Sequence, residues 1–289
     1  MNNFELFKLK QAGLTNLQIL NILDYQKEVG KSLSLRDMAV VSQTSKAGHF
    51  MESYKHLDLK ELRQQFNRFP SFSILDKEYP SDLANIYNPP VLLFYQGDLT
   101  LLDAPKLSMV GSRNCSTTGT KSLQKIIKEL DNQFVIVSGL ARGIDTAAHI
   151  ACLKNGGKTI AVVGTGLDVF YPKENRDLQE YLAKHHLVLS EYEAGQQPLK
   201  FHFPERNRII AGLSRGTVVA EAKQRSGSLI TCERAMEEGR DVFAIPGNIL
   251  DGRSDGCHHL IQEGAKCILS GQDILAEYEW GPSWNPILS

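Results

Sequence analysis

Four short stretches of the sequence combine glycines with basic or hydroxyl side chains at the point where an apolar run ends. They read VGSRNCSTTG (110–119), IVSGLARGIDTAAH (136–149), GTGLDVFYPKENR (164–176) and QRSGSLITCERAMEEG (224–239). Glycine lets the backbone approach a ligand closely, and the free N–H groups at the start of a following helix bind anions. The chemistry that this pattern predicts is the binding of phosphate groups.

Each of these stretches supplies candidate contacts. The charge comes from Arg113, Arg142 and Lys173, and arginine offers a fixed fork of donors that suits a phosphate. The full set of candidates in the four stretches is Gly111, Ser112, Arg113, Ser138, Gly139, Arg142, Gly143, Gly166, Lys173, Ser226, Gly227 and Ser228. A plain capped turn is the simpler interpretation of any single stretch, so the prediction depends on their number.

A fifth stretch is basic and aromatic. Between residues 198 and 215 it holds one acid, Glu205, and these basic and aromatic side chains: Lys200, Phe201, Phe203, Arg206, Arg208 and Arg215. Such charges suit the phosphates of a single strand while rings stack on its bases, although either phenylalanine can instead be a buried anchor. Several anion sites along one edge of a sheet predict an extended polyanion.

Other chemistries fit less well. A dinucleotide site needs GxGxxG after the first strand, where the sequence has GSRNCS, and a P-loop needs a glycine where Cys152 stands. Cys257, His258 and His259 are adjacent and have no partner pair elsewhere, so we expect neither a metal nor a cofactor.

One enzymatic alternative stays open. In a nucleoside-monophosphate phosphoribohydrolase-like enzyme, Glu233 would stabilise an oxocarbenium-like ribosyl transition state.

The composition predicts a cytoplasmic protein and requires that any polyanion site be local. The 289 residues include 32 Lys and Arg against 33 Asp and Glu, a formal net charge of −1. Five scattered cysteines without a CxxC pair favour reduced thiols. The N-terminus is charged and lacks an apolar run, which argues against a signal peptide, and no apolar run is long enough to predict a membrane span.

The elements that must position these residues fall into two parts. Residues 1–68 have apolar side chains at helical spacing and no proline, which predicts a small all-helical domain. Residues 69–280 are expected to form one α/β domain, followed by a short tail, 281–289. Within the α/β domain, residues 70–105 are rich in proline and are expected to be an irregular lead-in around one strand at 91–97.

From residue 106 onward, β-rich runs alternate with helical stretches. This alternation predicts a parallel sheet covered by helices on both faces, with its site at the carboxyl ends of the strands. The strands are expected at 106–110, 134–138, 159–164, 186–190, 216–222, 241–245 and 266–269.

Six long motifs, taken in order, are specific enough to indicate a family. VGSRNCSTTG, IVSGLARGIDTAAH, AVVGTGLDVFYPKENR, FPERNRIIAGLSRG, AKQRSGSLITCERAMEEGRDVFAIPG and DGCHHLIQEGA together resemble the DNA processing protein A (DprA/Smf) family, most closely its streptococcal members. The resemblance implies a sterile-alpha-motif-like helical domain followed by an extended Rossmann domain. It also implies a non-enzymatic homodimer that binds and protects incoming single-stranded DNA in natural transformation and loads the RecA recombinase on it.

The resemblance also assigns functional residues. The family's DNA-contacting loops fall on 111–113, on 138–143 and on Lys173, and its Arg-Asn-Arg segment falls on Arg206, Asn207 and Arg208. Its self-association surface falls on His258, Ile261 and Cys267, and its RecA-facing surface on Met236 and Gln262. Residues 1–68 are a candidate docking module for a regulatory or other protein.

Overall fold

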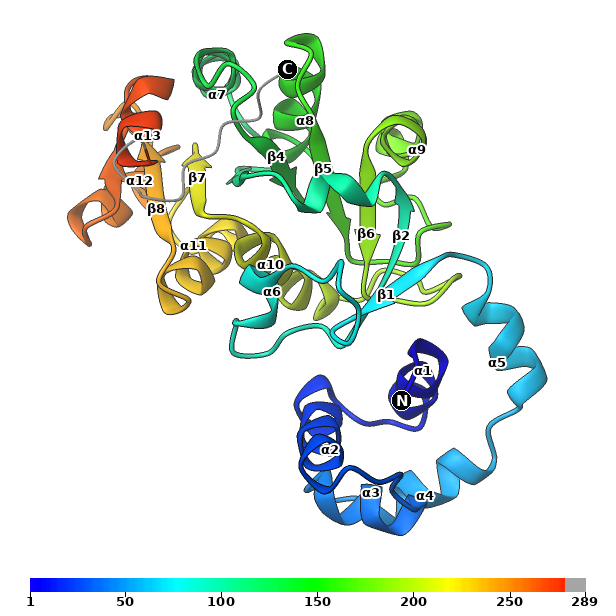
Figure 1. Cartoon of the computed structure of the whole chain (residues 1–289). Coiled ribbons are helices and arrows are strands. Elements are labelled where there is room, and N and C mark those ends of the chain that lie inside the picture. Colours follow the sequence, from blue (N-terminus) through cyan, green and yellow to red (C-terminus); the bar gives the residue numbers. More distant parts are fainter. Residues whose placement is uncertain (279–289) are drawn as a thin grey trace.

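The structure, a computed structural model, describes residues 1–278. The expected tail, 281–289, and the last two residues of the expected α/β domain lie outside this range. Five helices come first, shown in blue in Figure 1: α1 (Asn3–Gln11), α2 (Asn16–Val29), α3 (Leu35–Val41), α4 (Ala47–Lys55) and α5 (Leu59–Phe66). The sheet begins a few residues later, at Ser71.

Local sequence signals explain where these helices begin and end. Thr15 and Ser34 cap α2 and α3 in capping boxes: each side-chain oxygen accepts from the backbone N–H of the third residue of the helix, and the side chain of that residue accepts from the backbone N–H of the cap. Gly30 ends α2 in the left-handed conformation, with φ of 63°. The apolar faces of the helices meet in one core, and α1 extends that core to the sheet, because the rings of Phe7 and Phe94 lie 5.7 Å apart.

Nine strands form a single sheet in the order β1-β2-β6-β5-β4-β3-β7-β8-β9. Their bounds are β1 (Ser71–Ser73), β2 (Leu92–Gly97), β3 (Lys106–Gly111), β4 (Val135–Ser138), β5 (Thr159–Val163), β6 (Leu187–Ser190), β7 (Gly216–Ala220), β8 (Asp241–Ile245) and β9 (Lys266–Cys267). Every strand expected from the sequence is present, and the predicted extended Rossmann-like fold with a preceding helical domain is confirmed.

The sheet differs from the expectation at one edge. β1 pairs with β2, and β2 with β6, in antiparallel fashion, whereas the remaining pairs are parallel. The lead-in is therefore part of the sheet, which is mixed. Its prolines obscured β1, which has only three residues and lies at an edge, where a nearby proline costs no internal hydrogen bond.

Helices cover both faces of the sheet, because side chains alternate along each strand. In β4, Val135 and Val137 belong to one core and Ile136 to the opposite one. One face carries α7 (Thr117–Glu129), α8 (Ile144–Lys154), α9 (Arg176–His185) and α13 (Gly271–Tyr278). The other carries α6 (Ser81–Ala84), α10 (His202–Leu213), α11 (Gly227–Glu237) and α12 (Asp255–Gln262). Two short 3₁₀ turns complete the described elements, η1 (Leu99–Leu102) and η2 (Lys173–Asn175).

The strand order places a crevice at the centre of the sheet. The chain proceeds from β3 through β4 and β5 to β6 on one side, then returns to β7 on the other side of β3. The loop after β3 leads to α7 on one face, whereas the loop after β7 leads to α11 on the opposite face. In such sheets the two diverging loops leave an open crevice outside the carboxyl ends of the strands, where ligands bind.

Candidate nucleic-acid interface

Two adjoining cavities lie at the carboxyl ends of the strands. The β3–β7 cavity has a volume of about 790 Å³ and lies between the loops after β3 and β7 and the first turns of α10. The β4–β5 cavity, of about 630 Å³, lies between the loops after β4 and β5. Arg113, Asn114, Ala141, Tyr171, Phe203 and Arg206 line both of them, so the two form one continuous groove.

The charge of this groove is strongly one-sided. The basic residues that line it are Arg113, Arg142, Lys173, Lys200, Arg206, Lys223 and Arg253, and the acidic residues are Asp145 and Glu174. Within residues 1–278, no carboxylate lies within ion-pairing distance of Arg113, Lys173 or Lys200. These three side chains are exposed, so they are available to an anion.

The loop after β3 is held rigidly from below. Gly111 lies so close to β7 that a Cβ atom there would come within 2.0 Å of the carbonyl oxygen of Ala220. The backbone N–H of Ser112 donates to the Glu221 carbonyl at 2.9 Å. The buried Glu221 carboxylate also accepts from the backbone N–H of Ser116 at 2.7 Å. This bracing leaves the Arg113 side chain as the part of the loop that is free to meet a ligand.

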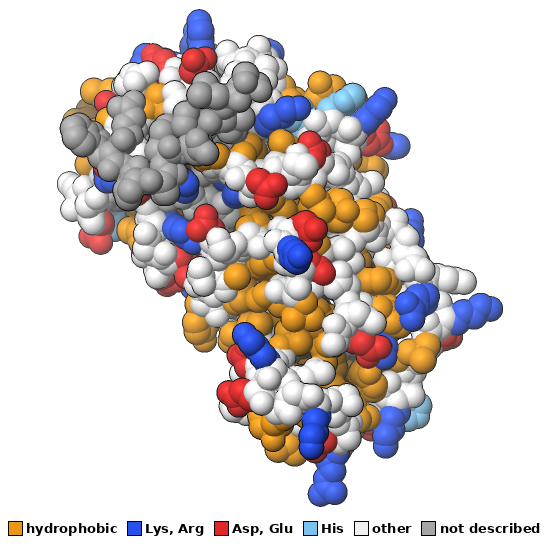
Figure 2. Space-filling view, viewed as in Figure 1, with side chains coloured by type: hydrophobic (Ala, Val, Ile, Leu, Met, Phe, Trp, Pro, Cys, Tyr) orange, Lys and Arg blue, Asp and Glu red, His pale blue; other side chains and the backbone are white. Residues whose placement is uncertain are grey.

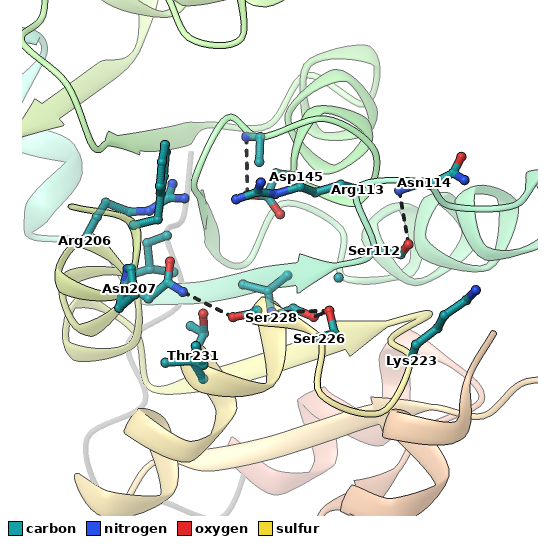
Figure 3. Close-up of a pocket in the computed structure, with 18 of the residues that line it drawn as sticks. Ser112, Arg113, Asn114, Asp145, Arg206, Asn207, Lys223, Ser226, Ser228 and Thr231 are labelled. Carbon is teal, nitrogen blue, oxygen red and sulfur yellow. Dashed lines mark hydrogen bonds between the residues drawn. The ribbon is translucent and has the colours of Figure 1, made fainter. Parts of the chain in front are cut away.

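Arg113 lies on an aromatic surface. Its guanidinium lies 5.5 Å from the ring centroid of Phe203, and the rings of Phe203 and Tyr171 lie 5.5 Å apart. Figure 3 shows Ser112, Arg113 and Asn114 on one side of the β3–β7 cavity, with Ser226, Ser228 and Thr231 opposite. Phe203 is therefore not a buried anchor, and Phe201 is 58 % exposed. Flat rings beside a guanidinium suit a nucleotide better than an isolated phosphate.

The loop after β4 contributes fewer contacts than expected. Ser138 is 0 % exposed and its hydroxyl donates to the Met109 carbonyl at 2.6 Å, so its expected contact with DNA is replaced by a structural role. A Cβ atom at Gly139 would lie 1.7 Å from Nη1 of Arg206, so glycine is required for α10 to approach this loop. Gly143 packs in the same way against the Ser112 carbonyl. Arg142 is exposed and forms an ion pair with Glu174.

The loop after β5 divides into a structural and an exposed part. Gly166 donates its backbone N–H to the Gln196 carbonyl at 2.9 Å and does not line either cavity, so it supports the loop and does not face the groove. Pro172 starts η2, and Lys173 follows as an exposed side chain of the β4–β5 cavity. Lys173 and Arg113 therefore line one and the same cavity although 60 residues of sequence separate them.

The Arg-Asn-Arg segment lies on α10, and its side chains point in different directions. Arg206 is 4 % exposed, and its Nη1 donates to the Val162 carbonyl at 2.8 Å. Asn207 lines the β3–β7 cavity, 3.4 Å from the Gly227 carbonyl. Arg208 lines neither cavity and forms an ion pair with the buried Glu191, so in this structure it holds the fold together and is not available to a ligand in the groove.

Asp145 lies beneath this part of the groove. It is buried, and burial raises its pKa although Arg206 and Arg113 act to lower it. Burial also lowers the pKa of Arg206, which Asp145 opposes. The Arg206 guanidinium thus forms part of the floor of both cavities and interacts electrostatically with a carboxyl group below them.

The loop after β7 forms the opposite wall. Ser226 caps α11, its hydroxyl oxygen accepting from the backbone N–H of Ser228, and Ser226, Gly227 and Ser228 all line the β3–β7 cavity. Sequence reasoning missed two basic residues of this wall, Lys223 and Arg253. Lys223 stands three residues before Ser226, and Arg253 follows β8 (Asp241–Ile245), so a search of every strand end for cations would have found both.

The remaining candidates lie outside the groove. Glu233, the residue proposed for the enzymatic alternative, is exposed on α11 and is not among the residues that line either cavity. His258 and Ile261 are half-buried on α12, and Cys267 is exposed on the edge strand β9. Met236 and Gln262 are exposed on α11 and α12. These five residues belong to the part of the chain that forms the β8–β9 end of the sheet.

The surface outside the groove carries charge of both signs. Figure 2 shows one face, on which Lys and Arg side chains are interspersed with Asp and Glu.

Within residues 1–278, no cluster of three or more His, Cys, Asp or Glu side chains has the geometry of a metal site. In the same range, no helix is both long and apolar enough to cross a membrane.

The fold and the groove together define a Rossmann-like α/β protein with a basic site suited to a polyanion. The sequence model of the DNA recombination-mediator protein A family matches residues 71–279, and that of the DNA processing protein A sterile alpha motif domain matches residues 1–62. The chain belongs to the DNA recombination-mediator protein A family, which confirms the resemblance of its six motifs.

Among the curated relatives that cover most of the chain are two proteins named DprA. The DNA processing protein DprA of Streptococcus pneumoniae is 65% identical over 280 residues, which are 97% of this chain and 99% of that protein. The DNA processing protein DprA of Bacillus subtilis is 47% identical over 216 residues, which are 74% of this chain and 72% of that protein.

Two solved structures agree with the fold. The X-ray structure of DNA processing protein A from S. pneumoniae has a TM-score of 0.95 at 65% identity, over 97% of this chain and 99% of that chain. A structure of DNA processing protein A from Helicobacter pylori has a TM-score of 0.66 at 30% identity, over 73% of this chain and 96% of that chain. The latter structure is described as giving insight into a single-stranded DNA binding mode of the H. pylori protein.

Proposed function

We propose that this protein binds single-stranded DNA along the groove formed by the β3–β7 and β4–β5 cavities. The observation that carries the proposal is that three cations without an ion-pair partner among the described residues, Arg113, Lys173 and Lys200, line the groove together with the rings of Phe203 and Tyr171. Cations at this density bind phosphates, and rings beside them stack on bases without reading sequence. The single-strand binding described for the H. pylori relative supports the same ligand.

The cellular role that we propose is that of a mediator without enzymatic activity. It protects incoming single strands in the cytoplasm during natural transformation and loads RecA on them, as a homodimer. The family's description as a recombination mediator supports this role. The exposed Met236 and Gln262 are the proposed contacts with RecA, and His258, Ile261 and Cys267 are the proposed dimer surface beside the edge strand β9.

Replacement of Arg113 and Lys173 together by alanine tests the site. Both side chains are exposed and neither has an ion-pair partner among the described residues, so the protein should remain folded. Loss of two phosphate contacts should weaken the binding of a labelled oligothymidylate by at least about tenfold and reduce the slope of log K against log salt by about 1.4. Fluorescence anisotropy over a salt series measures both quantities.

A matched control uses two exposed cations outside the groove. Lys184 and Arg176 lie on α9 and line neither cavity, so the Arg176→Ala, Lys184→Ala variant should bind the oligonucleotide like the wild type. Equal affinity of wild type and the Arg113→Ala, Lys173→Ala variant, with the thermal midpoint unchanged, would overturn this assignment of the binding site.

A further inference from the structure

The exposed ion pair between Arg142 and Glu174 lies inside the groove. Arg142 is one of four basic residues that line the β4–β5 cavity, and Glu174 is the one acidic residue among those that line it. The pair joins the loop after β4 to η2, and the side chains are 64% and 50% exposed. Because Glu174 lines the same cavity as Arg113 and Lys173, its carboxylate lies on the surface that the phosphates of a bound strand would approach.

Arg142 also lines a second, shallower depression. This α7–α8 depression has a volume of about 360 Å³, and its lining includes Cys115, Gln124, Thr146 and Ile150. Among the residues that line it, Arg142 is the one basic residue and Glu174 the one acidic residue. The hydroxyl of Thr146 is already used, because it donates to the Ala141 carbonyl at 2.6 Å. Because no other basic residue of the described chain lines this depression, Arg142 is the cation available there to an anion that extends beyond the two larger cavities.

In the Arg142–Glu174 pair, the carboxylate occupies the position on the guanidinium that a phosphate would occupy. A hydrogen bond from the Arg142 guanidinium is the largest cause that lowers the pKa of Glu174, so the carboxylate is ionised at neutral pH. A carboxylate and a phosphodiester offer arginine the same two-oxygen acceptor geometry. An exposed ion pair of this kind is weak, because water and salt screen both charges, so a polyanion held by neighbouring cations can displace it.

We propose that Arg142 is a displaceable phosphate subsite, occupied by the Glu174 carboxylate when no strand is bound. This inference rests on the proposed single-strand binding. A strand held by Arg113 and Lys173 continues past Arg142 toward the α7–α8 depression, and one of its phosphates replaces the Glu174 carboxylate. Glu174 thereby lowers the affinity of the whole groove, which favours release of the strand.

Three variants test the proposal with a labelled oligothymidylate and fluorescence anisotropy. Glu174→Gln removes the competing charge and should raise the affinity about threefold. Arg142→Ala should lower it by a similar factor and reduce the salt slope by about 0.7, the contribution of one phosphate contact. In the Arg142→Ala background, Glu174→Gln should have much less effect, because the cation for which it competes is absent.

The structure offers a closely matched control. Arg176 and Glu180 form an ion pair whose side chains are 62% and 50% exposed, but neither residue lines the groove or the α7–α8 depression. Glu180→Gln makes the same change of charge and should leave the affinity unchanged. An equal gain from Glu180→Gln would show that net charge alone is responsible and would overturn the proposal.

Two other outcomes also overturn it. If Glu174→Gln leaves the affinity unchanged, the pair is not displaced by DNA. If Glu174→Gln gives the same gain with and without Arg142, the carboxylate acts by direct repulsion and Arg142 is not the subsite. Failure of the proposed function is distinguishable from both outcomes, because the Arg113→Ala, Lys173→Ala variant would then bind as well as the wild type.

Discussion

The protein has two clusters of basic residues, one in the groove and one between the domains. Both consist of arginine and lysine, but the two clusters have opposite roles. In the groove, Arg113 and Lys173 are exposed and have no ion-pair partner among the described residues. Between the domains, Arg208 and Lys10 both pair with the buried carboxylate of Glu191. The first cluster is open to a ligand, whereas the second is occupied by the protein itself.

The interdomain cluster joins the helical domain to the sheet. The Lys10 amine lies 3.1 Å from Oε1 of Glu191, and the Asn16 amide donates to the same oxygen at 2.6 Å. Asn16 also accepts from the backbone N–H of Val91 at 3.3 Å. Basic residues near a strand end thus do not define a nucleic-acid site by number alone. Burial and pairing decide which of them bind a ligand and which hold the fold together.

The largest expected effect follows from removal of Glu191. Glu191→Ala leaves Arg208 and Lys10 without their shared carboxylate, and breaking a buried ion pair from one side costs about 3–5 kcal/mol of unfolding free energy. Urea denaturation measures this change. Affinity for an oligothymidylate, measured well below the unfolding midpoint, should stay that of the wild type because Glu191 does not line the groove.

Glu180→Ala is the control for that substitution, because it breaks an exposed pair with Arg176 and should change the unfolding free energy little. The contrast between the two clusters is wrong if Glu191→Ala and Glu180→Ala are equally stable, or if Glu191→Ala loses DNA binding while folded.

An intermediate effect is expected from acid. Burial alone would raise the pKa of Glu191, but Lys10, Arg208 and the Asn16 amide lower it from 4.5 to about 2. Because the pKa of the folded state lies below that of the unfolded state, this stabilisation is complete above about pH 4.5 and is lost as the pH falls toward 2. Between pH 7 and pH 3 the contribution of Glu191 to the unfolding free energy should fall by about 2 kcal/mol.

Other carboxylates titrate in the same range, so the comparison is with Glu191→Gln. Urea denaturation of both proteins at pH 7 and pH 3 isolates the contribution of Glu191 as the difference in their pH dependence. An identical loss in wild type and Glu191→Gln would mean that the charge of Glu191 does not stabilise the fold.

The smallest effect should come from a single cation of the groove. Lys200 is exposed and unpaired within the described residues, so Lys200→Ala should reduce oligothymidylate affinity about threefold and the salt slope by about 0.7, with no change of unfolding free energy. Lys184→Ala is the matched exposed lysine outside the groove. A loss of stability in Lys200→Ala would place this residue with the interdomain cluster instead.

Much of this architecture was predictable because local patterns carry it. Strand and helix periodicity located the strands from residue 91 onward, and glycines with cations at the strand ends indicated an anion site at the carboxyl edge of the sheet. β1 was not predictable, because three residues between prolines carry too little periodicity. The basic residues Lys223 and Arg253 escaped notice because Lys223 stands just before the stretch 224–239 and Arg253 lies in the loop after β8, which the four stretches do not include, although both line the β3–β7 cavity.

The sequence by itself determined that cations and glycines follow the strands of a Rossmann-like sheet. Only the tertiary structure decided what each side chain does, as Arg206, Asn207 and Arg208 illustrate. Successive residues of a helix point about 100° apart, so this segment of α10 cannot face one ligand as a unit. Packing of α10 against the sheet places Arg206 under the groove, Asn207 beside it and Arg208 against Glu191. The distribution of the three roles depends on contacts with residues distant in sequence, which local patterns do not contain.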